Sequence, residues 1–177
     1  MQTTEHSPRI LVVEPNKSAQ AVFARRLTDA GYRVIVIGIA SAAVAELYRS
    51  RVDLLIAELR MDGASGIELV RMMRDDSSLK DIPVILITGK SDATGAVDGF
   101  AAGADDVVAK PFHFEVLLAR IAQRLAKARS VRELRQDNAV LDARVVTRAI
   151  ELGEMRAAFA ASEVERLRLS AMVATPR

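Results

Sequence analysis

The sequence predicts an α/β fold, in which a five-stranded parallel sheet is covered by helices on both faces and is followed by a long C-terminal helix. Over about the first 128 residues, short aliphatic runs alternate with segments whose apolar side chains recur at i, i+3, i+4 and i+7. These runs are continuously apolar, as in strands that are buried on both faces. After about residue 128, Gly and Pro nearly vanish, which favours one long helix.

The elements of the sheet domain follow one another in regular order. Gly31 supplies a C-terminal stop for the first helix, and Ser41 is an N-cap candidate for the second. Right-handed crossovers between such strands give a doubly wound sandwich. We expect an N-terminal tail (1–8), the sheet domain (9–128), the long helix (129–170) and a C-terminal tail (171–177). The expected strands are RILVV (9–13), RVIVI (33–37), DLLIA (53–57), PVILI (83–87) and DVVA (106–109), with helices at 16–30, 42–50, 66–74, 92–102 and 113–128.

Composition excludes several classes of site. The chain has no Cys and two His, so disulfides, thiolate sites and a His-rich metal site are ruled out. No apolar run approaches the roughly 18 residues of a membrane span, and the first residues do not resemble a signal peptide. We therefore expect a cytoplasmic protein with no membrane partner. Lys and Arg exceed Asp and Glu by only two (25 against 23), so we also expect no nucleic-acid partner.

Polar side chains follow four of the expected strands. Glu14 and Pro15 come after the first, Glu58 after the third, Thr88 after the fourth and Lys110 after the fifth. In open parallel sheets, binding and reaction sites lie outside the carboxyl ends of the strands. We therefore expect these side chains to converge on one crevice.

The motifs ILVVEP, DLLIAELRMDGASGIEL, PVILITGKSD and AGADDVVAKPF, in this order and spacing, resemble the receiver domain of two-component response regulators. The resemblance covers about residues 8–128 and implies the flavodoxin-like fold with strand order 2-1-3-4-5. It also implies a phosphoacceptor at position 58, a Mg²⁺-binding acidic pair at Glu14 and Pro15, and phosphoryl contacts from Thr88 and Lys110. Such a site would stabilise a transferring phosphoryl group with a divalent cation and a lysine.

Three positions depart from the family pattern. Glu58 replaces the acceptor aspartate, and its extra methylene moves the carboxylate by about 1.5 Å, which in-line attack tolerates poorly. Pro15 offers no oxygen ligand to Mg²⁺. Val107 stands where the family has an aromatic switch residue. We therefore expect a degenerate, non-enzymatic receiver with no cofactor (Mg²⁺ at most weakly bound) and a fixed Glu58–Lys110 ion pair.

Other assignments remain possible for this site. Glu58 could still act as a slow phosphoacceptor with weak Mg²⁺ binding. Asp53, which begins its strand, and Asp62, in the following turn, are disfavoured as substitute acceptors. A flavodoxin-like enzyme that binds a small molecule is disfavoured too, because the sequence has no Gly-rich nucleotide cradle.

The C-terminal helix carries a heptad pattern. With Val131 at position a, eight of twelve a and d positions are apolar, and Asn138 at a favours two parallel strands in register. We expect a homodimer through this helix, with a histidine kinase or an output protein as the other partner. Alternatives are a lone amphipathic helix that packs on the receiver, or a regulatory fragment of a larger response regulator. The predicted seam comprises Val131, Leu134, Asn138, Leu141, Val145, Leu152, Met155 and Phe159.

Overall fold

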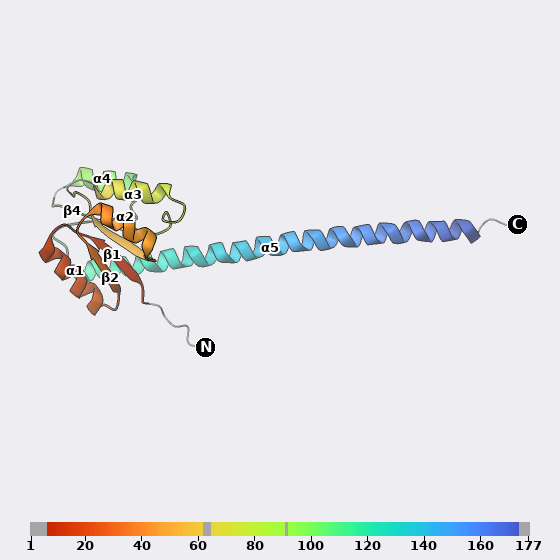
Figure 1. Ribbon diagram of the computed structural model, residues 1–177, viewed down its shortest axis with the longest axis horizontal. Helices are drawn as coiled ribbons and strands as arrows, with labels where there is room; N and C mark the ends of the chain where they lie inside the picture. The colour runs from red at the N-terminus through yellow and green to blue at the C-terminus, as the bar shows by residue number, and fades with distance from the viewer. Residues whose placement is uncertain (1–6, 62–64, 91, 174–177) are drawn as a thin grey trace. The chain divides into compact units, whose positions relative to one another are not determined.

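A computed structural model describes residues 7–61, 65–90 and 92–173 of the chain. Five strands form one parallel sheet in the order β2-β1-β3-β4-β5, so the predicted flavodoxin-like fold and strand order are confirmed (Figure 1). The elements are β1 (Arg9–Val13), α1 (Lys17–Asp29), β2 (Arg33–Ile37), α2 (Ala40–Arg49), β3 (Leu54–Glu58), α3 (Gly66–Asp75), β4 (Val84–Thr88), α4 (Ala93–Ala101), β5 (Asp106–Ala109) and α5 (Phe114–Val173).

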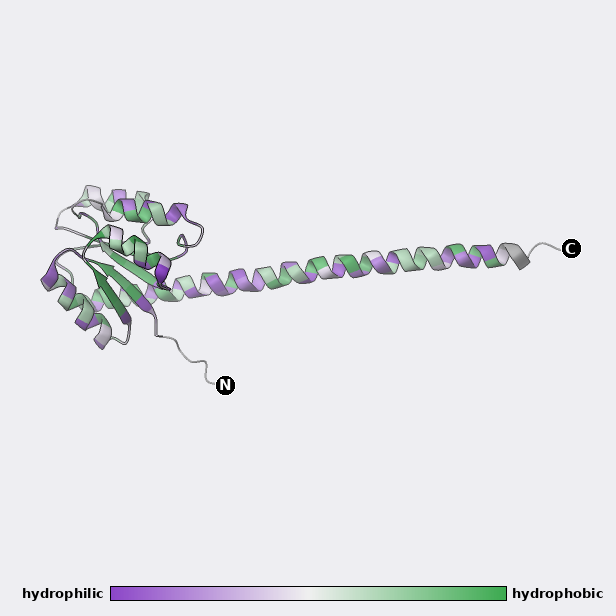
Figure 2. Ribbon diagram, in the orientation of Figure 1, coloured by the Kyte–Doolittle hydropathy of each residue, from purple (hydrophilic) through white to green (hydrophobic). Residues whose placement is uncertain are grey.

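The sheet separates two hydrophobic clusters, because successive side chains of a strand point to opposite faces. One cluster joins the sheet to α2 and α3, through residues such as Leu47 and Met73. The other joins it to α1 and the start of α5, through Phe23, Leu117 and Ile121. Figure 2 shows the strands as the most hydrophobic part of this domain. Burial on both faces explains why the strand sequences are continuously apolar.

The ends of three helices differ in how they are capped. Ser65 and Glu68 form a reciprocal capping box at α3, and Gly31 follows the C-cap residue of α1 with a φ of +89°. The N-cap prediction for Ser41 is wrong, because α2 already begins at Ala40 and its N-cap residue, Ile39, makes no side-chain cap bond. The third and fourth strands lie one residue later than expected, so that Glu58 and Thr88 are themselves the last residues of β3 and β4.

Helix α5 runs without interruption from Phe114 to Val173, so the expected fifth helix and the long C-terminal helix are one element. The chain divides into two compact units, residues 1–130 and 131–177. In the first unit, buried Asp106 at the start of β5 accepts hydrogen bonds from Arg120 and pairs with Arg124, which fixes the first turns of α5. Among the described residues, every helix is too short or too polar to cross a lipid bilayer.

Candidate functional site

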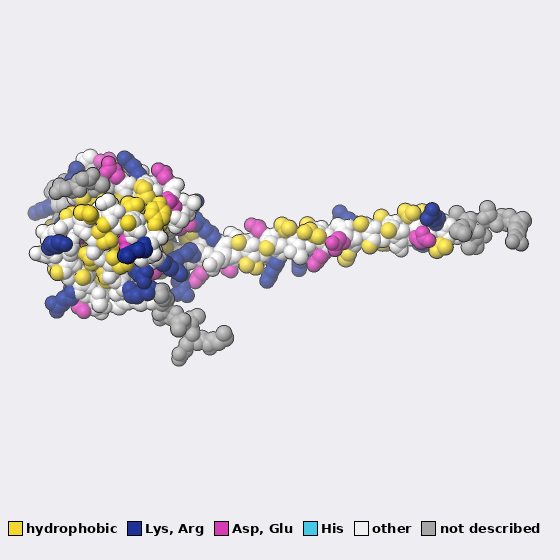
Figure 3. All heavy atoms as spheres, in the orientation of Figure 1, with side chains coloured by type: hydrophobic (Ala, Val, Ile, Leu, Met, Phe, Trp, Pro, Cys, Tyr) yellow, Lys and Arg dark blue, Asp and Glu magenta, His cyan; other side chains and the backbone are white. Residues whose placement is uncertain are grey.

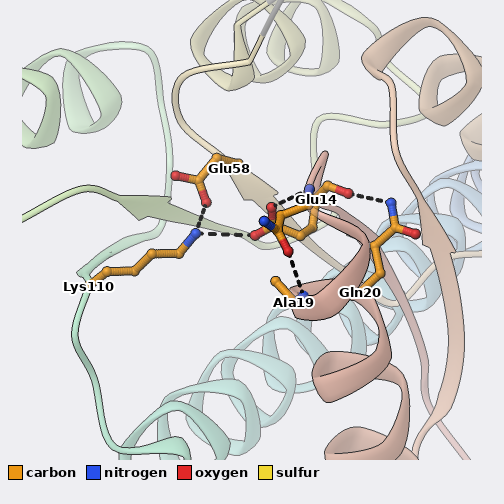
Figure 4. A network of polar contacts seen from close by, with 6 residues as sticks. Glu14, Ala19, Gln20, Glu58 and Lys110 are labelled. Carbon is orange, nitrogen blue, oxygen red and sulfur yellow. Dashed lines mark hydrogen bonds and ion pairs between the residues drawn. The ribbon is translucent and has the colours of Figure 1, made fainter.

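The carboxyl ends of β1, β3 and β5 bring two carboxylates and one ammonium group together. The strand register places Val13 beside Ala57 and Thr88 beside Ala109, so the residues that end or follow these strands share one edge. The Nζ atom of Lys110 lies 2.6 Å from Oε2 of Glu58 and 3.2 Å from Oε2 of Glu14. Figure 4 shows the lysine reaching both carboxylates. We call Glu14, Glu58 and Lys110 the charged triad.

Hydrogen bonds to its side chain and to its backbone hold Glu14 in place. Its side chain is 5% exposed, and its second oxygen, Oε1, accepts a hydrogen bond of 2.9 Å from the backbone N–H of Asn16. Its backbone carbonyl accepts a bond of 2.6 Å from Nε2 of Gln20 (Figure 4). Asn16 in turn caps α1 by accepting from the N–H of Ala19. Both carboxylate oxygens of Glu14 are therefore engaged by groups of the chain itself.

Burial and neighbouring charges shift the pKa values of Glu58 and Lys110. The Glu58 side chain is 15% exposed, and this desolvation raises its pKa; the neighbouring Glu14 charge adds to the rise, and Lys110 opposes it. For Lys110, desolvation lowers the pKa, but its hydrogen bonds and charge interactions with Glu58 and Glu14 outweigh that effect, so the pKa is raised. The ammonium stays protonated and is shared between two carboxylates.

Thr88 does not join the triad. It is buried, and its hydroxyl donates a hydrogen bond of 3.2 Å to Oδ2 of Asp92. Asp92 also accepts two bonds from the Arg60 guanidinium, at 2.8 and 3.1 Å, and caps α4 at the N–H of Gly95. Hydrogen bonds from Arg60 and Gly95 lower the pKa of Asp92 to about 2. Thr88 still lies at the same edge of the sheet, where its backbone carbonyl accepts a hydrogen bond of 2.8 Å from the backbone N–H of Lys110.

The remaining predicted residues lie around this site. Pro15 is exposed beside Glu14. Val107 is partly buried and packs on the α2–α3 side of the sheet, near Gly99 of α4. Asp53 lies at the opposite end of β3 from Glu58, where it accepts a hydrogen bond from the backbone N–H of Arg9. Asp62, the other substitute acceptor considered, lies outside the described residues.

Four residues of the site were not predicted from the sequence. Asn16 and Asp92 precede helices and are favoured N-cap types, so their capping roles were readable. Gln20 and Arg60 gave no local signal, because their partners are identified only by the folded chain.

The sequence matches the response regulator receiver domain over residues 10–122. The chain belongs to this family. The receiver is 36% identical over 119 residues to the DNA-binding response regulator MtrA of Mycolicibacterium smegmatis, with 67% of this chain and 51% of MtrA covered. It is 32% identical over 142 residues to the sensory transduction protein RegX3 of the same species, with 80% of this chain and 61% of RegX3 covered.

Solved structures give the same result for the receiver. The signal receiver domain of a signal transduction histidine kinase from Syntrophus aciditrophicus matches with a TM-score of 0.65 and 30% identity, over 68% of this chain and 92% of that one. The chain spans about half the length of the MtrA proteins that it matches. DNA binding is part of the MtrA name and concerns the whole of that longer protein.

Proposed function

We propose that this receiver is a two-component signalling protein that does not run the phosphorylation cycle and acts through protein–protein contacts. The charged triad is the observation that supports this most. At the acceptor position, Oε2 of Glu58 is 2.6 Å from Lys110, so the lysine already carries the negative partner that a phosphoryl group would otherwise supply. A charge that is fixed by the sequence cannot be added or removed by a kinase.

The donor set at this site fits Mg²⁺ poorly. Mg²⁺ requires oxygen ligands in near-octahedral geometry. Pro15 has no side-chain oxygen, Glu14 bonds Asn16 and Lys110 with its two oxygens, and Glu58 is paired with Lys110. Within the described ranges, no three His, Cys, Asp or Glu side chains gather as a metal-binding group. We therefore propose that no resident metal is needed and that Mg²⁺ binds at most weakly.

Labelling with acetyl phosphate or beryllofluoride plus Mg²⁺ tests this proposal. Three proteins are compared by intact mass and ¹⁹F NMR: wild type, Glu58→Asp, and Glu58→Asp with Pro15→Asp. We expect no adduct on wild type, little on the single variant because the metal ligand is still missing, and an adduct on the double variant. The double variant is the matched control, since it shows that the fold can accept the label. A stoichiometric adduct on wild-type Glu58 would overturn the proposal and favour the slow phosphoacceptor.

We further propose that two chains pair in parallel through the predicted seam. Within the described helix, the large apolar seam residues are 38–69% exposed in the single chain. Apolar surface of this extent on one helix favours association in water. Asn138 at an a position supports a two-stranded parallel register. The kinase or output partner would then meet two receivers at once.

A second candidate is that this receiver is the regulatory part of a longer response regulator. The observation that favours it is the length of the MtrA relatives, of which the chain spans about half. The mass of the natural protein on an immunoblot of its own cells distinguishes the two. A band well above 19.2 kDa would favour the longer regulator.

A further inference from the structure

Helix α5 carries a second apolar face besides the predicted seam. Nine positions between residues 139 and 167 are spaced alternately by four and three residues, which is the spacing of a helix–helix contact. All nine are occupied by Ala, Gly, Val, Ile or Leu. We call this set the second face: Ala139, Ala143, Val146, Ile150, Gly153, Ala157, Ala160, Val164 and Leu167.

The second face is exposed and free of charge. Its four large side chains, Val146, Ile150, Val164 and Leu167, are 59–66% exposed. The same stretch contains nine charged residues, from Asp142 to Arg166, and none of them falls on the face. At 1.5 Å per residue and about 10 Å of width, the face covers about 400 Å². That matches the largest apolar patches on whole monomers, which usually mark contact sites.

The second face is distinct from the predicted seam. At 100° per residue, the midpoint of the two seam positions in a heptad lies about 150° around the helix axis from the midpoint of the two second-face positions. A chain paired through the seam therefore still presents its second face to solvent. Figure 3 shows hydrophobic side chains along more than one side of the described helix.

We propose that the second face pairs, antiparallel, with the second face of another copy of this chain. The order of side-chain sizes along the face favours this pairing. With the pair centred between residues 151 and 152, the four layers on each side of the centre are Ala139 with Val164, Ala143 with Ala160, Val146 with Ala157, and Ile150 with Gly153. No layer contains two branched side chains, so volume is nearly even along the contact, as close packing requires.

The parallel alternative lacks this match. In register, each residue of the face meets its own copy, so Ile150 opposes Ile150 and Gly153 opposes Gly153. One layer would then hold two branched side chains, and the next, three residues on, would hold no side chain. Two helices at one interaxial distance cannot pack both layers well. Reversal of one chain removes the conflict.

Gly153 supplies a separate argument. Glycine in a helix interior is unfavourable, and a Cβ at Gly153 would meet nothing within 4 Å in the single chain. Neither the helix nor the folding of one chain therefore explains this residue. In the antiparallel pair it lies opposite Ile150, where a larger side chain would collide. Pairs joined through the seam can thereby join other pairs, so assembly goes beyond a dimer.

Disulfide trapping tests the arrangement, since the chain has no cysteine of its own. Full-length Ala143→Cys and Ala160→Cys, carrying tags of different mass, are mixed and oxidised mildly. We expect a mixed disulfide between the two variants. Neither variant alone should cross-link to itself, because the equivalent positions would lie about 25 Å apart, beyond the roughly 7 Å limit between bridged Cα atoms.

Two control variants complete the experiment. Thr147→Cys, which lies between the two faces, measures chance collisions. Gly153→Leu, added to both cysteine variants, should reduce the mixed disulfide about tenfold or more by overfilling the Ile150 layer. A disulfide between two Ala143→Cys chains would show a parallel contact. A mixed-disulfide yield that Gly153→Leu leaves unchanged would show that a second copy does not occupy the face. A mixed-disulfide yield no higher than the yield of Thr147→Cys would show the same. Any of these outcomes overturns the proposal. A Leu141→Cys self-link reports separately on the predicted seam.

Discussion

Replacement of Lys110 by Met should destabilise the receiver at neutral pH. The change removes the only cation of the charged triad and leaves two carboxylates, Glu14 at 5% and Glu58 at 15% exposure, facing each other. Removal of one partner from a fully buried ion pair costs about 3–5 kcal/mol. Lys110 itself is 39% exposed, so water screens part of this loss. We expect a loss of about 2 kcal/mol in the free energy of unfolding, or roughly 6 °C in Tm for a unit of this size.

Tyrosine fluorescence during urea unfolding is the assay. Both tyrosines, Tyr32 and Tyr48, lie in the first unit, so the signal reports on residues 1–130 and not on the part of α5 that follows. The control Lys90→Met removes an exposed lysine and should change stability by less than about 0.5 kcal/mol. Glu58→Gln added to Lys110→Met should recover most of the loss. If Lys110→Met behaves like the control, or the double variant recovers nothing, Glu58 and Lys110 are not energetically coupled and the reasoning is refuted.

Three further predictions concern the same domain. The pKa of Glu58 is raised in the folded state by burial, so protonation of this side chain favours folding below its unfolded pKa of about 4.5, and this stability is lost as pH rises through the folded pKa. In urea titrations, wild type should therefore lose stability relative to Glu58→Gln as the pH rises above about 4.5. A difference that grows in favour of wild type over this rise would contradict the prediction. Asp92→Ala removes the N-cap of α4, so amide hydrogen exchange in residues 93–101 should accelerate by about five- to tenfold. The matched cap variant Ser65→Ala should instead accelerate amide hydrogen exchange in α3. Asp106→Ala leaves Arg120 and Arg124 without their shared carboxylate and should lower unfolding free energy by about 2 kcal/mol, measured by tyrosine fluorescence; a loss below about 0.5 kcal/mol would count against it.

Strand and helix content followed directly from local sequence. The aliphatic runs, the 3.6-residue periodicity between them and Gly31 at a helix end predicted every element of the sheet domain to within about two residues at each boundary, except the end of α5. These signals are readable because they depend on neighbours in the chain. Ser41 shows the limit even there, since α2 begins at Ala40, two residues earlier than expected, without a side-chain cap.

The strand ends also predicted that the charged triad lies at one edge of the sheet. The motif order put Glu14, Glu58 and Lys110 after strands that run parallel, and parallel strands bring their carboxyl ends to the same edge. The sequence alone thus determined which charges would be close. It could not determine which hydrogen bonds each would make.

Tertiary structure decided those bonds. The Thr88 hydroxyl turns to Asp92, and Arg60 reaches the same carboxylate from 32 residues away. Glu14 divides its two oxygens between Asn16 and Lys110. A side chain selects among several possible partners by rotamer and distance, and both are fixed only when the sheet and helices have packed. Local periodicity carries no information about that choice.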